Sequence, residues 1–169
     1  FAGLVSRYTM QKPLIAAVNG LAMGGGFEVA LACDIIIAAE NAFFALPEPR
    51  VGLAALAGGL HRLSRQIPMK QAMGMILTGR RVMAAEGYKL GFVTEVVREG
   101  EALAGAQRWA EQILECSPVS IRTSKDVVMR GDKYASVREA FEADYQSVKD
   151  MQNSLDFIEG PLAFSEKRP

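Results

Sequence analysis

The stretch "KPLIAAVNGLAMGGGFEVALACDIII" constrains the fold more than any other part of the chain, because its pattern changes twice within a short distance. An apolar run from Leu14 to Val18 breaks at Asn19 and Gly20, and a helical pattern begins near Gly26. This order predicts a strand, a loop and the start of a helix. Glycines adopt positive φ readily and let other groups approach the backbone, while the first N–H groups of a helix have no acceptor within the helix. Such a turn is suited to hold developing negative charge.

Two glutamates accompany glycine-rich turns. Glu28 follows the run Gly24 to Gly26, and Glu48 precedes a second glycine turn at Gly58 and Gly59. Two carboxylates that face one another suit proton transfer, because one holds a proton while the other accepts one. A structural role is the alternative for each glutamate. Glu28 would offset the helix dipole, for about 0.3 to 1 kcal/mol when exposed, and Glu48 would pair with Arg50 in a solvated loop. The spacing alone does not decide between the two.

The composition indicates one globular domain that binds neither nucleic acid nor a membrane. The chain has 169 residues, of which half are apolar, so a substantial core can form. Its 19 basic and 19 acidic side chains cancel, so no net field attracts a polyanion. Glu28 and Asp34 interrupt the longest apolar stretch before it reaches the ~18 residues that span a bilayer. Cys33 and Cys116 lie far apart in apolar or helical contexts, which favours a reducing compartment and a cytoplasmic location.

Several other chemistries lack the residues they need. His61 is the only histidine, which excludes a metal site built from several histidines, and no C-x-x-C pattern is present. No serine stands in the strand-turn-helix context of a nucleophile. We therefore expect no metal, and we interpret His61 as a surface residue. Arg62 and Arg65 are interpreted as a solvated helix face.

The remaining periodicity predicts alternating elements followed by a helical tail. An apparent helix end at residues 1–8 opens the chain, and residues 35–40 and 42–47 form two strands arranged as a hairpin or a corner. Ser117 is expected to cap the helix that begins at Pro118. The other predicted elements are helices at residues 58–67, 69–79, 84–91, 102–116, 119–129 and 137–151, and a strand at residues 92–97.

The ordered motifs "KPLIAAVNGLAMGGGFEVALACDIIIAAENAFFALPEPRVGL", "AGGLHRL" and "LTGRRVMAAEGYKLGFVTEVV" resemble the crotonase superfamily of enoyl-CoA hydratases and isomerases. The likeness covers essentially the whole chain. It implies an α/β fold, a spiral of ββα turns, in which residues 1–98 are the C-terminal part of the core and carry the active site. Residues 99–169 would form a helical trimerisation region, giving a homotrimer or a dimer of trimers. The N-terminal part of the family, with a second oxyanion donor and much of the adenine pocket, is expected to be missing from this chain.

The resemblance also implies roles for individual residues. The substrate would be an acyl group carried as a coenzyme A thioester, with no other cofactor and no metal. The backbone N–H of Gly25 would hold the thioester oxygen, Glu28 would activate or hold a water molecule, and Glu48 would deliver a proton to the α-carbon. Further substrate contacts are implied at Met23, Gly24, Pro47, Leu56 and Lys167.

One segment departs from the family pattern. Hydratases usually carry Pro-Gly-Ala-Gly-Gly where this chain has Ala-Leu-Ala-Gly-Gly at residues 55–59, so Leu56 replaces a glycine close to the expected water and acyl chain. The segment "FALPEPRVGL" is similar to the corresponding segment in branches of the family that dehydrate carnitinyl-CoA. A functionalised acyl group is therefore an alternative to a plain 2-enoyl chain.

The pair of glutamates favours hydration of a 2-enoyl-CoA, or the reverse dehydration. A Δ3,Δ2-enoyl-CoA isomerase that uses one glutamate as a proton shuttle is the nearest enzymatic alternative. A non-catalytic scaffold or binding protein on the same fold is an alternative from another class, because fold does not fix function. The presence of both Glu28 and Glu48 argues against a scaffold, and the neutral charge balance argues against RNA binding.

Overall fold

The structure is a computed structural model that describes residues 1–168, and the chain divides into two compact units. The first unit comprises residues 1–8 and 14–110, and it contains every strand of the described chain. The second unit comprises residues 9–13 and the helical segment from Glu111 onward. The expected division at residue 98 into a catalytic core and a trimerisation region concerns function and stays a prediction.

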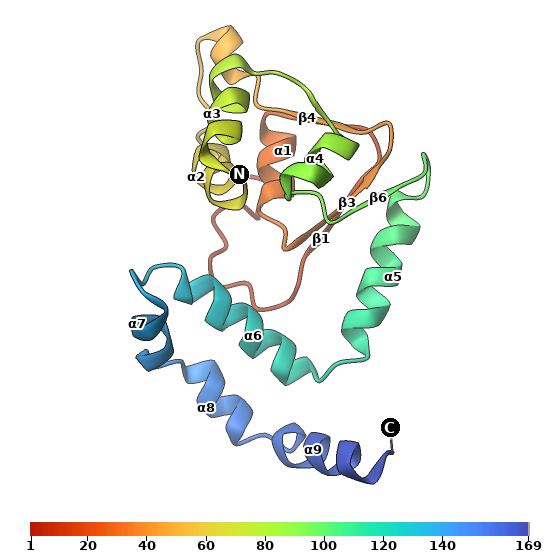
Figure 1. The fold of residues 1–169 in the computed structure, drawn as a ribbon, viewed down its shortest axis with the longest axis vertical. Helices are drawn as coiled ribbons and strands as arrows, with labels where there is room; N and C mark the ends of the chain where they lie inside the picture. The colour runs from red at the N-terminus through yellow and green to blue at the C-terminus, as the bar shows by residue number, and fades with distance from the viewer. Residues whose placement is uncertain (169) are drawn as a thin grey trace. The chain divides into compact units, whose positions relative to one another are not determined.

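The first unit is built from a repeated order of two strands and a helical segment (Figure 1). β1 pairs in parallel with β3, and β2 pairs in parallel with β4, so the second repeat stacks on the first. The register places Ile15 opposite Ile35 and Leu21 opposite Phe43. This stacking is the expected spiral of ββα turns, and the predicted α/β fold is confirmed. The elements of the two repeats are β1 (Ile15–Val18), β2 (Leu21–Met23), α1 (Gly25–Leu31), β3 (Ile35–Ala39), β4 (Phe43–Ala45), the 3₁₀ helix η1 (Glu48–Val51) and α2 (Gly59–Gln66).

Later elements extend both sheets of the first unit. β6 adds in parallel to β3, giving the strand order β1-β3-β6, and β5 adds antiparallel to β4, giving β2-β4-β5. Gly79 and Gly91 end α3 and α4 in the left-handed conformation, with φ of 60° and 100°, as the sequence pattern predicts. The elements that follow α2 are α3 (Met69–Thr78), β5 (Val82–Met83), α4 (Ala84–Leu90), β6 (Glu95–Val97) and α5 (Ala102–Leu114).

Three aromatic rings form the centre of the core in the first unit. The ring centroids of Phe27 and Phe44 are 5.1 Å apart, and Phe92 lies 5.2 Å from Phe27 and 5.1 Å from Phe44. Pairs of this geometry contribute about 0.5–1.5 kcal/mol beyond the area they bury. The cluster fixes α1 against β4. These are the elements that carry or immediately precede Glu28 and Glu48.

The strand and helix boundaries correct the sequence expectations in three places. β3 and β4 belong to different sheets, so they form the corner and not the hairpin. Residues 1–8 form turns and not a helix end, with the N–H of Leu4 donating to the carbonyl of Phe1. The short strands β2 and β5 were not expected. With three and two residues, they are too short for an alternating pattern to stand out.

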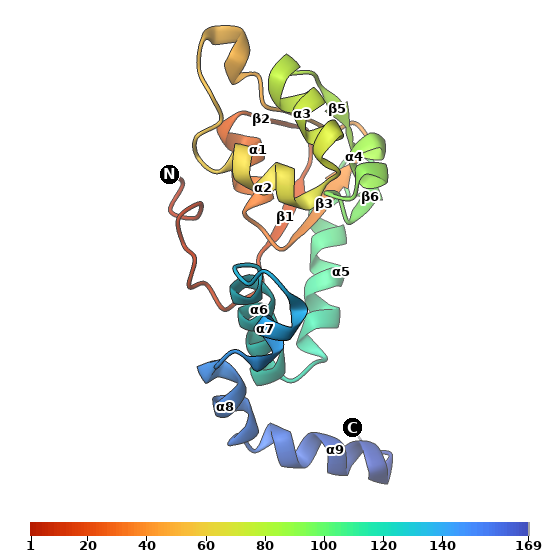
Figure 2. The same ribbon diagram turned by 60° about the vertical axis from the view of Figure 1, so that its left-hand side comes forward.

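The second unit consists of helices, which Figure 2 shows from the side. Ser117 caps α6 as expected, because its Oγ accepts a hydrogen bond from the N–H of Ser120 at 3.2 Å. α8 packs on α6 through Thr123, whose Oγ1 donates to the carbonyl of Ser147 at 3.0 Å. The helices are α6 (Pro118–Gly131), α7 (Val137–Glu142), α8 (Gln146–Gln152) and α9 (Asp156–Glu166).

Two features of this tail differ from the prediction. Residues 137–151 are not one helix, because Ala143 has an extended ψ of 151° and separates α7 from α8. α9 was not predicted, since Pro161 lies inside it and proline interrupts the usual helical signal. Within residues 1–168, no helix combines the length and the apolar character needed to cross a membrane.

Candidate active site

The glycine turn between β2 and α1 forms the floor of the candidate site. Met23 ends β2, and the N–H of Gly24 donates to the carbonyl of Ala45 at 2.9 Å. Gly24 has φ of 53°, a conformation that favours glycine. The ring of Phe1 lies against Gly25, where it would clash with an added Cβ. Gly25 begins α1, so its N–H lies in the first turn, where the helix itself offers no acceptor.

Glu28 is buried and held by the backbone. Glu28 is 4% exposed, and its Oε1 accepts a hydrogen bond from the N–H of Gly59 at 2.9 Å. The N–H of Glu28 donates to the carbonyl of Gly24 at 3.0 Å. A glutamate that only offsets a helix dipole lies in solvent, where the effect costs no desolvation. The burial of Glu28 therefore favours a role for its carboxylate inside the protein.

Glu48 is the first residue of η1, and its carboxylate lies against the same glycine turn. A Cβ added at Gly24 would lie 3.0 Å from Oε1 of Glu48. Oε2 of Glu48 is buried and has no hydrogen-bond partner in the part of the chain that the structure describes. Arg50, the partner in the structural alternative for Glu48, makes another contact, because its Nε donates to the carbonyl of Thr78 at 3.0 Å. Buried polar atoms without a partner are rare in folded proteins and mark places where a ligand or water binds.

The structure thus brings the Glu48 carboxylate to the first turn of α1, the turn to which Glu28 belongs. Glu48 contacts Gly24 with its side chain, and Glu28 bonds to Gly24 through its backbone. Pro47 precedes Glu48 and forms the N-cap of η1. The predicted roles of these residues and of Met23 in substrate binding stay predictions.

The loop at residues 55–59 reaches the site through a residue that the sequence did not single out. Leu56 is 81% exposed, whereas Ala55 is 3% exposed. A Cβ added at Gly59 would lie 3.0 Å from Cβ of Ala55 and 3.0 Å from Oε1 of Glu28. Ala55 and Glu28 therefore crowd the same point. A substrate contact of Leu56 stays a prediction, and no pattern in the sequence distinguished Ala55 from its neighbours.

Arg62 has a different role from the solvated face that was expected. Its Nη2 donates to the carbonyl of Val5 at 2.6 Å, and Nη1 donates to the carbonyl of Ala57 at 3.4 Å. It thereby ties the glycine turn at Gly58 to the first residues of the chain. Sequence reasoning missed this role because both acceptors are backbone carbonyls, which carry no residue-specific signal.

Two other predicted residues lie outside these contacts. His61 is exposed, as expected of a surface residue. Lys167 is the C-cap of α9 in the second unit, with φ of 54°, and its predicted contact with substrate stays a prediction. Among residues 1–168, no group of three or more histidine, cysteine, aspartate or glutamate side chains is placed to hold a metal ion.

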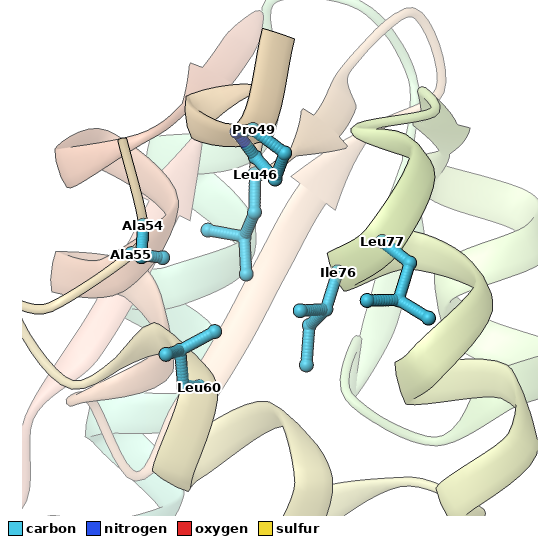
Figure 3. Close-up of a pocket in the computed structure, with 7 residues that line it drawn as sticks. All are labelled: Leu46, Pro49, Ala54, Ala55, Leu60, Ile76 and Leu77. Atoms are coloured by element: carbon cyan, nitrogen blue, oxygen red, sulfur yellow. The ribbon is translucent and has the colours of Figure 1, made fainter. Parts of the chain in front are cut away.

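An apolar cavity of about 240 Å³ lies beside the loop that carries Glu48. Figure 3 shows Leu46 and Leu60 pointing into a space that Ile76 borders from the opposite side. The lining combines residues around η1 with the loop before α2 and with both helices α2 and α3. The lining residues are Leu46, Pro49, Ala54, Ala55, Leu60, Ile76 and Leu77.

The family comparison agrees with this geometry. The family model described as enoyl-CoA hydratase/isomerase matches residues 2–169. The chain belongs to this family. The expected resemblance to the crotonase superfamily is confirmed.

Named relatives lie on both the hydratase and the dehydratase side of the family. A carnitinyl-CoA dehydratase from Escherichia coli O157:H7 is 41% identical over 99% of this chain, which spans 66% of that relative's length. A Mycobacterium abscessus structure described as an enoyl-CoA hydratase/isomerase has a TM-score of 0.91 and 41% identity, covering 99% of this chain and 68% of the other. An enoyl-CoA hydratase from Mycobacterium tuberculosis has a TM-score of 0.90 and 37% identity, covering 98% of this chain and 65% of the other.

Proposed function

We propose that the protein is an enoyl-CoA hydratase that adds water syn across the 2,3 double bond of a 2-enoyl-CoA, or catalyses the reverse dehydration. The placement of the two carboxylates carries the proposal. Glu28 is buried and accepts from Gly59, and the buried Oε2 of Glu48 has no partner within residues 1–168. Two carboxylates that lie against the glycine turns at the start of α1 and α2 would provide a base and an acid for the two ends of a double bond.

The proposed reaction passes through an enolate. Glu28 takes a proton from water while the water oxygen bonds to C3, and the electron pair of the C2–C3 double bond moves toward the thioester carbonyl. The N–H of Gly25 donates to the developing oxyanion, an interaction that is typically worth a few kcal/mol in such sites. Glu48 then delivers its proton to C2 and the carbonyl re-forms. The buried surroundings of Glu28 strengthen these charge interactions, because a low dielectric screens them less than water does.

The first test replaces each carboxylate by the isosteric amide. We expect Glu28→Gln and Glu48→Gln in the full-length protein to lower kcat for crotonyl-CoA hydration by roughly 10²–10⁴-fold, the usual contribution of a positioned acid or base. Loss of the enoyl absorbance measures the rate, and circular dichroism confirms that each variant is folded.

Glu86→Gln is the matched control for this test. Glu86 lies on α4 and pairs with Arg80, which precedes that helix. Glu86 takes part in none of the contacts described for the site, so its replacement should leave kcat unchanged. If Glu48→Gln hydrates crotonyl-CoA and longer enoyl-CoAs at the wild-type rate, the two-carboxylate mechanism is wrong.

Dehydration of carnitinyl-CoA is the second candidate, and the 41% identity to carnitinyl-CoA dehydratases favours it. That reaction would use the same pair of carboxylates in the reverse direction, so the two candidates differ in the acyl group and not in the proton transfer. A Δ3,Δ2-isomerase is distinguished by its product. Conversion of a 3-enoyl-CoA in H₂¹⁸O without ¹⁸O uptake would indicate isomerisation.

Coenzyme A carries the acyl group in this proposal, and no further cofactor takes part in any step. We also propose a cytoplasmic location and a homo-oligomer, a trimer or a dimer of trimers. The surface of the second unit supports the oligomer, because Phe141, Leu155 and Phe164 are each more than four-fifths exposed, at 88%, 83% and 86%. Large apolar side chains that are exposed in one subunit can be buried when subunits associate.

A further inference from the structure

We propose that the cavity lined by Leu46, Leu60 and Ile76 binds the end of the acyl chain and selects an uncharged, short aliphatic group over one that ends in a quaternary ammonium. This inference rests on the proposed function, because it assigns the substrate class of the same site. It separates this protein from the carnitinyl-CoA dehydratases to which it is 41% identical.

Residues next to both glutamates line the cavity. Leu46 and Pro49 line it and stand on either side of Pro47 and Glu48 in the chain. Ala55 also lines it, and its Cβ crowds the same point at Gly59 as Oε1 of Glu28 does. In this proposal, an acyl chain whose double bond lies between the two glutamates extends past Ala55 into the cavity.

The chemistry of the lining decides which group fits. All seven side chains are aliphatic or proline, so the wall offers neither an aromatic face nor a carboxylate. A quaternary ammonium cannot lose its charge, and proteins bind it with aromatic faces and nearby anions. Burying it in an aliphatic wall leaves the charge uncompensated, which is costly.

A fixed positive charge beside the cavity acts in the same direction. Arg50 follows the lining residue Pro49, and its Nε donates to the carbonyl of Thr78, which follows the lining residue Leu77. The guanidinium therefore bridges two segments of the cavity wall. Its charge repels a cationic acyl group and has little effect on a neutral one.

The size of the cavity favours a short chain. Its volume of about 240 Å³ is below the range of roughly 300–1,000 Å³ that is typical of pockets for drug-sized ligands. A short extension beyond C4 fits this space. Each methylene that it buries should tighten binding roughly fourfold.

The decisive experiment compares two substrates of the same shape. Crotonobetainyl-CoA carries a trimethylammonium group on C4, and 5,5-dimethyl-2-hexenoyl-CoA carries a tert-butyl group in the same place. We expect kcat/KM of the full-length protein to be at least about tenfold higher for the neutral compound, because only the charge differs. Equal rates, or a preference for crotonobetainyl-CoA, would overturn the assignment while leaving the hydratase proposal intact.

Binding of the saturated pair gives a readout that does not depend on turnover. 5,5-Dimethylhexanoyl-CoA and its trimethylammonium counterpart, 4-(trimethylammonio)butanoyl-CoA, cannot be hydrated, and calorimetric titration measures their Kd. Tighter binding of the neutral compound supports the cavity assignment even if the protein proves inactive as a hydratase. Tighter binding of the cationic compound contradicts it.

A charge placed in the wall tests the location. Leu77 lines the cavity and is 66% exposed, so Leu77→Glu should fold and should lower the ratio of the cationic Kd to the neutral Kd several-fold. Met73→Glu adds the same charge one turn earlier on α3, outside the cavity lining, and should leave the ratio unchanged. An equal effect of both substitutions would show that the cavity does not hold the acyl end.

Discussion

Gly59 shows how a single residue without a side chain positions a functional one. Its N–H holds Oε1 of Glu28 at 2.9 Å, and the space where its Cβ would lie is taken by Ala55 and Glu28. A donor with a side chain could not approach so closely. The sequence placed Gly59 in a turn, but only the structure shows that the turn serves the carboxylate.

We expect Gly59→Ala to impair activity more than stability. The new Cβ would lie 3.0 Å from both Ala55 and Glu28, so the carboxylate must shift, and a shift of about 1 Å can cost roughly 10²-fold in rate. Overpacking should lower the free energy of unfolding by about 1–3 kcal/mol. Steady-state kinetics and urea denaturation measure the two effects.

Gly74→Ala is the control for this substitution. Apart from the backbone of its own helix and its chain neighbours, no atom lies within 4 Å of a Cβ added at Gly74 in α3, so alanine should raise the free energy of unfolding by about 0.5–1 kcal/mol. If Gly59→Ala retains the wild-type kcat, Glu28 does not need the position that Gly59 gives it.

At the scale of elements, Arg62 on α2 fixes the turn that precedes its own helix. We expect Arg62→Met to lower the free energy of unfolding by about 1–3 kcal/mol, because the carbonyl of Val5 loses a charged donor at 2.6 Å. Arg65→Met is the matched control. Arg65 is exposed on the same helix, so we expect a smaller loss from its replacement. Similar losses for the two variants, measured by urea denaturation, would contradict the anchoring role of Arg62.

Arg80, which precedes α4, and Glu86, which lies within it, form an ion pair whose contribution to stability depends on pH. The hydrogen bond from Arg80, at 2.7 Å, holds the pKa of Glu86 below its usual range, and the charge of Arg80 adds to this effect. A lowered folded-state pKa contributes stability above the unfolded pKa, and that stability is lost as the pH falls through the folded value. Both side chains are more than a third exposed, at 35% and 42%, so the contribution of the ion pair to stability should be below about 1 kcal/mol.

Glu86→Gln checks this sign. The variant should lose its stability deficit relative to wild type as the pH falls through the acidic range, because wild-type Glu86 also becomes neutral there. Thermal melts of both proteins between neutral and acidic pH measure the difference. A deficit that grows toward acidic pH would show that the pair does not stabilise the protein in this way.

At the scale of the whole molecule, the second unit predicts association. We expect the full-length protein to sediment as a trimer or a multiple of one, and Phe141→Glu combined with Phe164→Glu to shift it toward the monomer. Arg138→Glu, at an exposed position that already pairs with Glu142, is a control for added charge on α7 and should shift the protein less. Analytical ultracentrifugation measures the distribution. A wild-type monomer at micromolar concentration would contradict the oligomer.

Helix starts and ends that depend on a single residue could be predicted from the amino-acid sequence alone. The glycine run before Glu28, the left-handed stops at Gly79 and Gly91, and the cap at Ser117 each depend on the conformation or side chain of one residue, so they could be read from the chain. The motifs that resemble the family allowed the spiral fold to be predicted as well. Short strands and the break between α7 and α8 were missed because they are fixed by pairing and packing with distant segments.

The surroundings of the two glutamates become visible only in the folded protein. Contacts between residues far apart in the chain bury Glu28 under Gly59, leave Oε2 of Glu48 without a partner among the described residues, and turn Leu56 outward while Ala55 faces inward. The aliphatic cavity likewise collects side chains from two helices and two loop segments. Burial and the choice of hydrogen-bond partner depend on three-dimensional packing, and the order of residues along the chain does not specify them locally.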